Sequence, residues 1–189
     1  MGKSGELLKN TAIISIGKMG TQVVNFLLLP LYTAKLTTEA YGNFDYVTTI
    51  ASFLVPLMTM LMEESMFRFL IDSQTDEEKE TIISHTFLFC FVSGLITSLI
   101  IGGASWIFNY SIGYSILIYC ISSLFMALSN ALARGTGHIG LYSLSNFFVS
   151  ITIILLNLIL ILGFHQGFYA LVTSACVANV IAALFVLTK

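Results

Sequence analysis

The chain has 189 residues, of which 57% are hydrophobic and only 10% are charged. Because soluble domains carry about 25% charged residues, this composition excludes an ordinary water-soluble domain. The formal net charge of −2 also excludes a basic nucleic-acid-binding protein. No Asp, Glu, Lys or Arg lies between Glu80 and Arg134, or between Arg134 and Lys189. Each of these stretches is long enough for two membrane crossings of about 20 apolar residues.

The sequence predicts an all-α fold, a polytopic membrane helical bundle of about six transmembrane helices. Lipid offers no hydrogen-bond partners, so each crossing must be helical or part of a closed barrel. The segments lack the alternation of barrel strands, which leaves helices. The predicted helices cover residues 11–34, 43–70, 82–108, 113–133, 141–164 and 168–188. They form a single transmembrane domain over residues 1–189, and the first is too long for a cleavable signal peptide.

Polar segments separate these helices and predict the orientation of the bundle. Residues 72–80 are expected to form a soluble acidic loop, and residues 109–113 and 163–167 short turns. An even number of crossings places both termini on one side. That side then holds most of the basic residues, while Lys35 lies opposite. Basic residues favour the cytoplasmic side, so both termini are predicted to be cytoplasmic.

Polar residues recur at helical spacing within four of the predicted helices, and therefore share one face of each. They are Ser15, Lys18, Gln22 and Asn25 in 11–34; Asp45, Thr48, Thr49, Ser52, Pro56, Thr59 and Glu63 in 43–70; Ser122, Ser123, Ser129 and Asn130 in 113–133; and Ser143, Asn146, Ser150 and Asn157 in 141–164. Such faces turn away from lipid and form either a water-filled cavity or interhelical hydrogen bonds. For the Ser and Thr positions of the two later helices, hydrogen bonding is favoured.

Charged residues within the helices are the candidates for binding. Lys18 either extends back to the cytoplasmic interface or offers an anion a positive charge inside the cavity. Glu64 and Arg68 are spaced for an i, i+4 ion pair at the end of their helix. Glu63 shares the polar face that Asp45 begins, and could contact substrate or a coupling ion. Arg134 is either a cytoplasmic anchor or a contact for a phosphate head group.

Enzymatic chemistry, metals and cofactors are not predicted. The three cysteines, Cys90, Cys120 and Cys176, lie in apolar runs without metal-ligand spacing and are expected to pack as small apolar residues. The three histidines fall at the ends of the predicted helices, and no phosphate-binding glycine loop or nucleophile motif occurs.

Several short strings along the chain carry a family resemblance. They are Leu-Leu-Lys-Asn-Thr at residues 7–11, Phe-Leu-Leu-Leu-Pro-Leu-Tyr-Thr at 26–33, Glu-Ala-Tyr-Gly at 39–42, Glu-Ser-Met-Phe-Arg-Phe at 64–69, Ala-Arg-Gly at 133–135 and Gly-Leu-Tyr at 140–142. In this order, the set resembles the Wzx-type oligosaccharide flippases of polysaccharide biosynthesis. These belong to the superfamily that includes the MATE drug exporters.

The resemblance implies two six-helix lobes around a central cavity, of which this chain resembles the N-terminal lobe. Such proteins move undecaprenyl-diphosphate-linked oligosaccharides across the cytoplasmic (inner) membrane for O-antigen, lipopolysaccharide, capsule or exopolysaccharide assembly. The expected partners are this lipid-linked oligosaccharide, membrane lipids, and a second lobe or polysaccharide assembly proteins. The predicted substrate-binding residues lining the cavity are Lys18, Gln22, Asn25, Asp45, Ser52, Glu63, Arg68 and Arg134.

Further expectations concern mechanism and the alternatives to it. Lys18 suits an anionic diphosphate better than a cationic drug, and Pro30 and Pro56 could permit helix bending. One alternative is a cation-coupled drug exporter that uses Glu63 or Asp45 as its ion site. Another is a non-transporting fragment or assembly subunit, because the chain stops at Lys189 where a second lobe would follow.

Overall fold

The computed structural model describes residues 15, 22–23, 26, 28–164 and 166–188, and this part of the chain contains helices and no strand. Residues 28–35 are helical and lead into the first helix with defined bounds. In chain order the elements are α2 (Thr38–Thr59), α3 (Met62–Asp72), α4 (Asp76–Ile107), α5 (Ser111–Gly135), α6 (Ile139–Asn157), the π-helical turn η1 (Leu158–Gly163) and α7 (Phe168–Leu187). The predicted all-α fold is confirmed.

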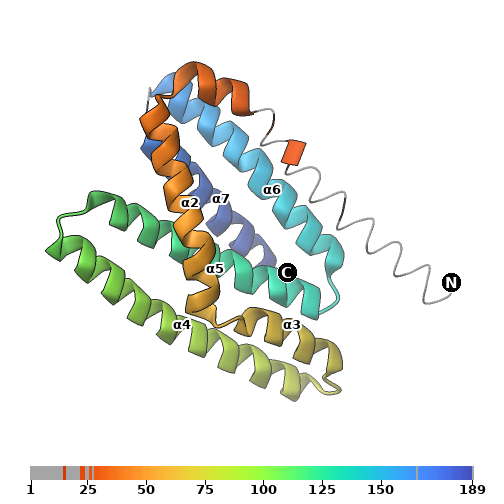
Figure 1. Cartoon of the computed structure of the whole chain (residues 1–189). Helices are drawn as coiled ribbons and strands as arrows, with labels where there is room; N and C mark the ends of the chain where they lie inside the picture. The colour runs from red at the N-terminus through yellow and green to blue at the C-terminus, as the bar shows by residue number, and fades with distance from the viewer. Residues whose placement is uncertain (1–14, 16–21, 24–25, 27, 165, 189) are drawn as a thin grey trace.

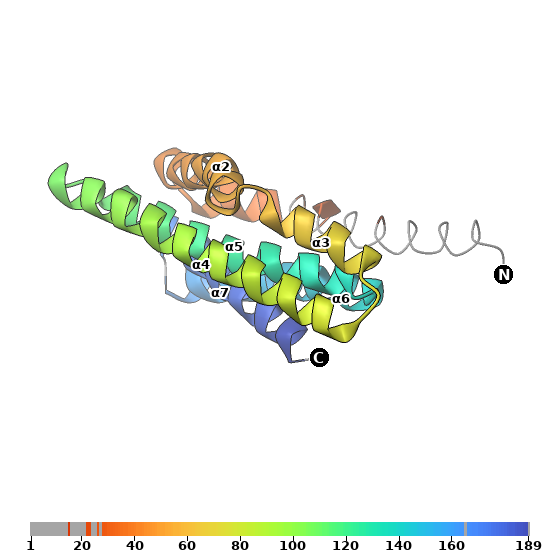
Figure 2. The ribbon, with the colours of Figure 1, turned by 90° about the horizontal axis from the view of Figure 1, so that it is seen from below.

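Helix α5 is the centre of the bundle and packs against α2, α3, α4, α6 and α7 (Figure 1). The main hydrophobic core lies where α2, α4 and α5 meet, and its buried members include Val47, Ala51, Cys90, Cys120 and Leu124. All three cysteines are buried, as predicted for small apolar packing residues. Seen from below, α2 and α3 lie on one side of α5, and α7 lies on the other (Figure 2).

The bundle has the length and the apolar surface of a membrane protein. Four helices, α4, α5, α6 continued by η1, and α7, are long and apolar enough to cross a bilayer, and the bent pair α2–α3 forms a fifth candidate span. Large apolar side chains of α4 such as Leu88, Phe91 and Leu99 are exposed, as expected for a surface that faces lipid. These spans match five of the six predicted crossings. The remaining one, at residues 11–34, falls largely outside the described residues.

The two ends of the bundle differ in chemistry. One end, here called the charged end, carries the α3–α4 and α5–α6 turns and the end of α7 (Figures 1 and 2). The opposite end, here called the aromatic end, carries the α4–α5 and η1–α7 turns. Exposed aromatic side chains gather at its turns, among them Trp106, Phe108, Tyr110, Phe164 and Tyr169. Such residues mark the level of the lipid head groups in membrane proteins.

The segment predicted as one helix over residues 43–70 is instead two helices. The helix begins earlier, at Thr38, because Thr37 caps it by accepting a hydrogen bond from the Ala40 amide at 3.1 Å. It is then interrupted at Met60 and Leu61, which both adopt left-handed backbone conformations. The axes of α2 and α3 differ by 52° across this break. Pro56 lies inside α2, one turn before the bend, so the bend does not sit at the proline.

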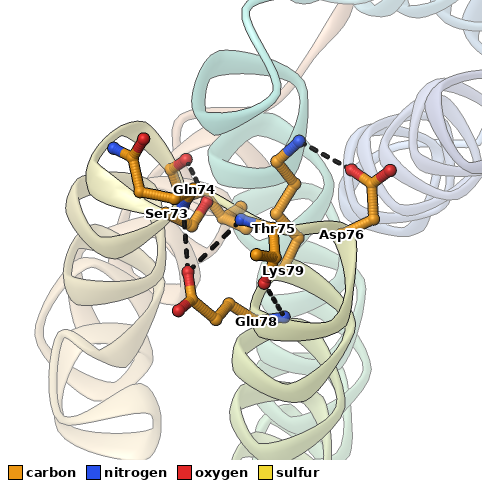
Figure 3. Close-up of polar contacts among 7 residues, drawn as sticks. Ser73, Gln74, Thr75, Asp76, Glu78 and Lys79 are labelled. Atoms are coloured by element: carbon orange, nitrogen blue, oxygen red, sulfur yellow. Dashed lines mark hydrogen bonds and ion pairs between the residues drawn. The ribbon is translucent and has the colours of Figure 1, made fainter.

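The segment predicted as an acidic loop over residues 72–80 is mostly helical, because α4 begins at Asp76. Thr75 caps the helix: its hydroxyl accepts from the Glu78 amide at 3.2 Å, and the Glu78 carboxylate accepts from the Thr75 amide at 3.4 Å (Figure 3). The Lys79 ammonium pairs with Asp76 at 2.9 Å. This capping box, with acidic residues in the first turn, favours a helix over a loop.

Candidate functional site

The polar residues of α2 lie mainly on the surface of this bundle. Asp45, Thr49, Ser52 and Pro56 are exposed, and together they are called the α2 polar face. The Ser52 hydroxyl donates to the carbonyl of Thr49 at 2.7 Å, within the same helix. Hydroxyl groups that bond only to their own helix leave their remaining capacity available for water or a ligand. Within the described bundle, the α2 polar face is therefore exposed and not packed against a neighbouring helix.

The same stripe becomes buried where α2 meets α3. Thr59 is fully buried, and its hydroxyl accepts from the Leu61 amide at 3.2 Å across the helix break. Glu63 follows in the first turn of α3 and is 8% exposed. Its Oε2 atom has no hydrogen-bond partner among the described residues. A buried carboxylate oxygen without a donor is energetically costly, which sets Glu63 apart from the packed residues around it.

Arg134 at the end of α5 joins α3 to α5 and α6 at the charged end. Its Nη2 atom donates to Glu64 Oε1 at 2.7 Å. Its guanidinium carbon lies 4.7 Å from the centre of the Phe67 ring and 5.6 Å from that of Tyr142. The expected Glu64–Arg68 pair is wrong for the described residues, because Glu64 reaches across to another helix. A guanidinium between aromatic faces is a favourable cation–π arrangement.

Some polar side chains of α5, α6 and α7 form hydrogen bonds between helices. The Asn179 amide of α7 donates to Ser122 and Ser123 of α5, both at 3.4 Å. The Asn146 side-chain amide of α6 donates to the side-chain oxygen Oδ1 of Asn130 on α5 at 3.3 Å. These bonds confirm the prediction that Ser122 and Ser123 take part in interhelical hydrogen bonds.

A second buried network of hydrogen bonds connects helices at the aromatic end. The Ser174 hydroxyl of α7 donates to the Asn157 carbonyl oxygen at 2.6 Å, and the Asn157 amide donates to the Tyr32 hydroxyl at 2.6 Å. Asn157 and Ser174 are almost wholly buried. Asn157 sits at the junction of α6 and η1, so the network ties this junction to α7 and to the helical residues 28–35. These bonds hold the three segments together in the buried interior.

The predicted site residues do not converge on one pocket. Asp45 begins the α2 polar face near the aromatic end, Ser52 lies further along it, and Gln22 is exposed. Glu63 is buried in the first turn of α3, next to the helix break, and Arg68 is exposed further along α3, while Arg134 ends α5 at the charged end. Lys18 and Asn25 are outside the described residues. Their assignment to substrate binding therefore stays a prediction.

The sequence analysis did not identify three residues that form hydrogen bonds between helices. For two of them, the sequence contains a feature that indicates such a bond. Asn179 is an amide inside an apolar span, which indicates an interhelical partner. Tyr32 is a hydroxyl-bearing ring inside the predicted first crossing, where a buried hydroxyl needs a bond. Ser93 of α4 donates to the Met58 carbonyl, which the helix break deprives of its own helical partner. No local pattern in the sequence predicts the contact between Ser93 and Met58.

Comparison with known proteins places the chain in a family. The sequence profile described as polysaccharide biosynthesis protein matches residues 7–188. A Lsg locus protein of Haemophilus influenzae is 30% identical over 64 residues, a stretch that covers 34% of this chain and 16% of that relative. No solved structure matches the chain at a significant level. Because the profile spans nearly all of the sequence, the chain belongs to the polysaccharide biosynthesis protein family.

Proposed function

We propose that the chain is the N-terminal lobe of a flippase that moves an oligosaccharide linked to undecaprenyl diphosphate across the cytoplasmic membrane. The observation that carries this proposal is the family match over residues 7–188 of a membrane helical bundle. The α2 polar face adds physical support. The Asp45 carboxylate, exposed on a membrane-spanning segment, would be unsatisfied in lipid, so we expect this face to border a chamber containing water and sugar.

The chemistry of the substrate fits the polar groups available. Sugar hydroxyls require hydrogen-bonding side chains, which Thr49, Ser52 and Asp45 supply along the α2 polar face. A diphosphate requires positive charge. Lys18, in the predicted first crossing, and Arg68, exposed on α3, supply it in the proposal. A second lobe would close the chamber opposite α2 and rock against this one, as in other transporters built from repeats.

The orientation follows from the distribution of basic residues. Arg68 on α3, Lys79 in the first turn of α4 and Arg134 at the end of α5 lie toward the charged end, while Lys35 precedes Leu36, which packs against η1 and α7 at the opposite end. Because basic residues favour the cytoplasm, the charged end is cytoplasmic in the proposal. The lipid-linked substrate would then enter beside α3, where Arg68 is accessible to its diphosphate.

A complementation experiment tests this function. A strain that lacks the gene is supplied with the wild-type protein, Lys18→Ala or Lys18→Arg, at matched membrane expression. The proposal predicts that the wild type and Lys18→Arg restore surface polysaccharide, while Lys18→Ala does not. An unaltered polysaccharide profile in the deletion strain, together with increased drug susceptibility, would contradict the proposal and favour a drug exporter.

A further inference from the structure

The break between α2 and α3 has the properties of a hinge. Met60 and Leu61 have φ angles of 48° and 57°, a left-handed conformation that residues other than glycine rarely adopt. Two such residues in succession store backbone strain, which the surrounding structure must hold in place. Both side chains are exposed, at 71% and 55%. A rotation at these two residues would therefore disturb little side-chain packing at the break itself.

The α2 side of the break is anchored to the bundle. Ser93 of α4 donates to the Met58 carbonyl, and Met58 itself is buried in the main core. The Thr59 hydroxyl donates to the Pro56 carbonyl at 3.4 Å and accepts from the Leu61 amide, so it closes the end of α2. These bonds hold the end of α2 in position. Any rotation at Met60 and Leu61 would thus move α3.

Helix α3 packs against both α4 and α5. Its buried residues Met66 and Leu70 pack with Ala131 of α5 in a cluster separate from the main core. The Glu64–Arg134 pair adds an ionic contact to α5. This packed arrangement leaves Glu63 Oε2 and Arg134 Nε buried without described partners. A buried polar group without a partner costs free energy, which disfavours the packed position of α3.

We propose that α3 is a hinged segment at the charged end, which rotates about Met60 and Leu61, and that the Glu64–Arg134 ion pair is the latch that holds it against α5. When the latch opens, the α3–α5 interface around Leu70 becomes accessible from the charged end. The role of this movement in transport rests on the proposed flippase function, where it would gate entry of the substrate. The movement itself does not depend on that function.

The rate of cysteine labelling tests the hinge without any transport assay. Leu70 is 3% exposed, so Leu70→Cys in a background without the native cysteines should react slowly with a membrane-impermeant maleimide in membranes open at both faces. Adding Glu64→Gln should accelerate labelling about two- to five-fold, the effect expected from weakening an ion pair whose carboxylate side chain is 53% exposed. Reversal of the pair, Glu64→Arg with Arg134→Glu, should restore slow labelling. Equal rates with and without Glu64→Gln would overturn the proposal.

A matched control separates hinge opening from general unfolding. Val186 near the end of α7 is 4% exposed, and α7 has no substantial contact with α3. Labelling of Val186→Cys should stay slow when Glu64→Gln is added. Equal acceleration at both positions would show global loosening of the bundle and would also overturn the latch.

Disulfide cross-linking tests whether the movement serves transport. A Cβ atom at Gly135 of α5 would lie 2.9 Å from Leu70 Cβ, and one at Gly113 would lie 2.9 Å from Ser105 Cβ. Both separations are shorter than the roughly 3.5–4.5 Å usual between the Cβ atoms of a disulfide, so each bridge requires the two helices to move slightly apart. Oxidised Leu70→Cys/Gly135→Cys should lose polysaccharide export and regain it on reduction. Oxidised Ser105→Cys/Gly113→Cys, which joins α4 to α5 at the opposite end, should retain export.

The two experiments fail in distinguishable ways. Export that persists with α3 fully cross-linked to α5 would overturn the gating role of the hinge, while the flippase function would stand. Faster labelling of Leu70→Cys when Glu64→Gln is added would support the hinge. If deletion of the gene also left the surface polysaccharide unchanged, the hinge would stand and the flippase function would be contradicted.

Discussion

The contact between α3 and α5 depends on the absence of a side chain at Gly135. An added Cβ atom there would lie 2.7 Å from Leu70 Cδ1 and 2.9 Å from Leu70 Cβ. The Cδ1 atom can rotate away, but the Cβ atom is fixed to the backbone of α3. Gly135→Ala therefore requires the two helices to separate by a few tenths of an ångström.

The cost of this change follows from the crowding. Overpacking a close contact typically destabilises by about 1–3 kcal/mol, and the better helix propensity of alanine returns at most about 1 kcal/mol. Gly135→Ala should therefore lower the free energy of unfolding by about 1–2 kcal/mol. The midpoint of thermal unfolding in detergent should fall by a few degrees, since about 2–4 °C corresponds to 1 kcal/mol at this size.

Gly103→Ala is the matched control for this measurement. Gly103 lies inside α4, and a Cβ atom there would meet nothing within 4 Å. Its replacement should leave the midpoint unchanged or raise it slightly, because only the helix propensity changes. If Gly135→Ala were as stable as Gly103→Ala, the close approach of α3 to α5 at Leu70 would be refuted.

Two further predictions concern hydrogen bonds. In a double-mutant cycle of unfolding in detergent, Asn157→Ala and Ser174→Ala should show a coupling free energy of about 0.6–2 kcal/mol, the range for hydrogen bonds between membrane helices. Additive effects of the two substitutions would refute the network. Thr75→Ala should cost about 1 kcal/mol by removing the cap of α4, and should raise hydrogen exchange at the amides of residues 76–80. Thr81→Ala, which removes only a bond within the helix to Glu77, is its control, and equal exchange in both would contradict the capping role.

The long apolar spans were the part of the fold most accessible from the sequence. The predicted helix over 113–133 is α5 (Ser111–Gly135), and that over 168–188 is α7 (Phe168–Leu187). Uninterrupted apolar runs must be helical in lipid, and the turns that bound them contain polar residues. The capping box at Thr75 and Glu78 was also readable from the Ser/Thr-x-x-Glu spacing, although the density of charge there suggested a loop.

The break in the second predicted helix could not be located from local sequence. Met60 and Leu61 are neither glycine nor proline, the residues that normally mark an interruption. The break is accompanied instead by a contact between residues distant in the sequence, the bond from Ser93 to the Met58 carbonyl. The partner of Glu64 was hidden for the same reason, because Arg134 lies 70 residues away, whereas the i, i+4 rule considers only Arg68.

The central claim is that the α2 polar face borders a water-accessible chamber in the membrane. In a background without native cysteines, Ser52→Cys is treated with a membrane-impermeant thiol reagent in intact membranes. Leu99→Cys, at an exposed apolar position of α4 that should face lipid, is the control. The account predicts that Ser52→Cys reacts with the soluble reagent and that Leu99→Cys reacts only with a lipid-soluble one. A well-folded Ser52→Cys protein that stays unmodified by the soluble reagent would contradict the account.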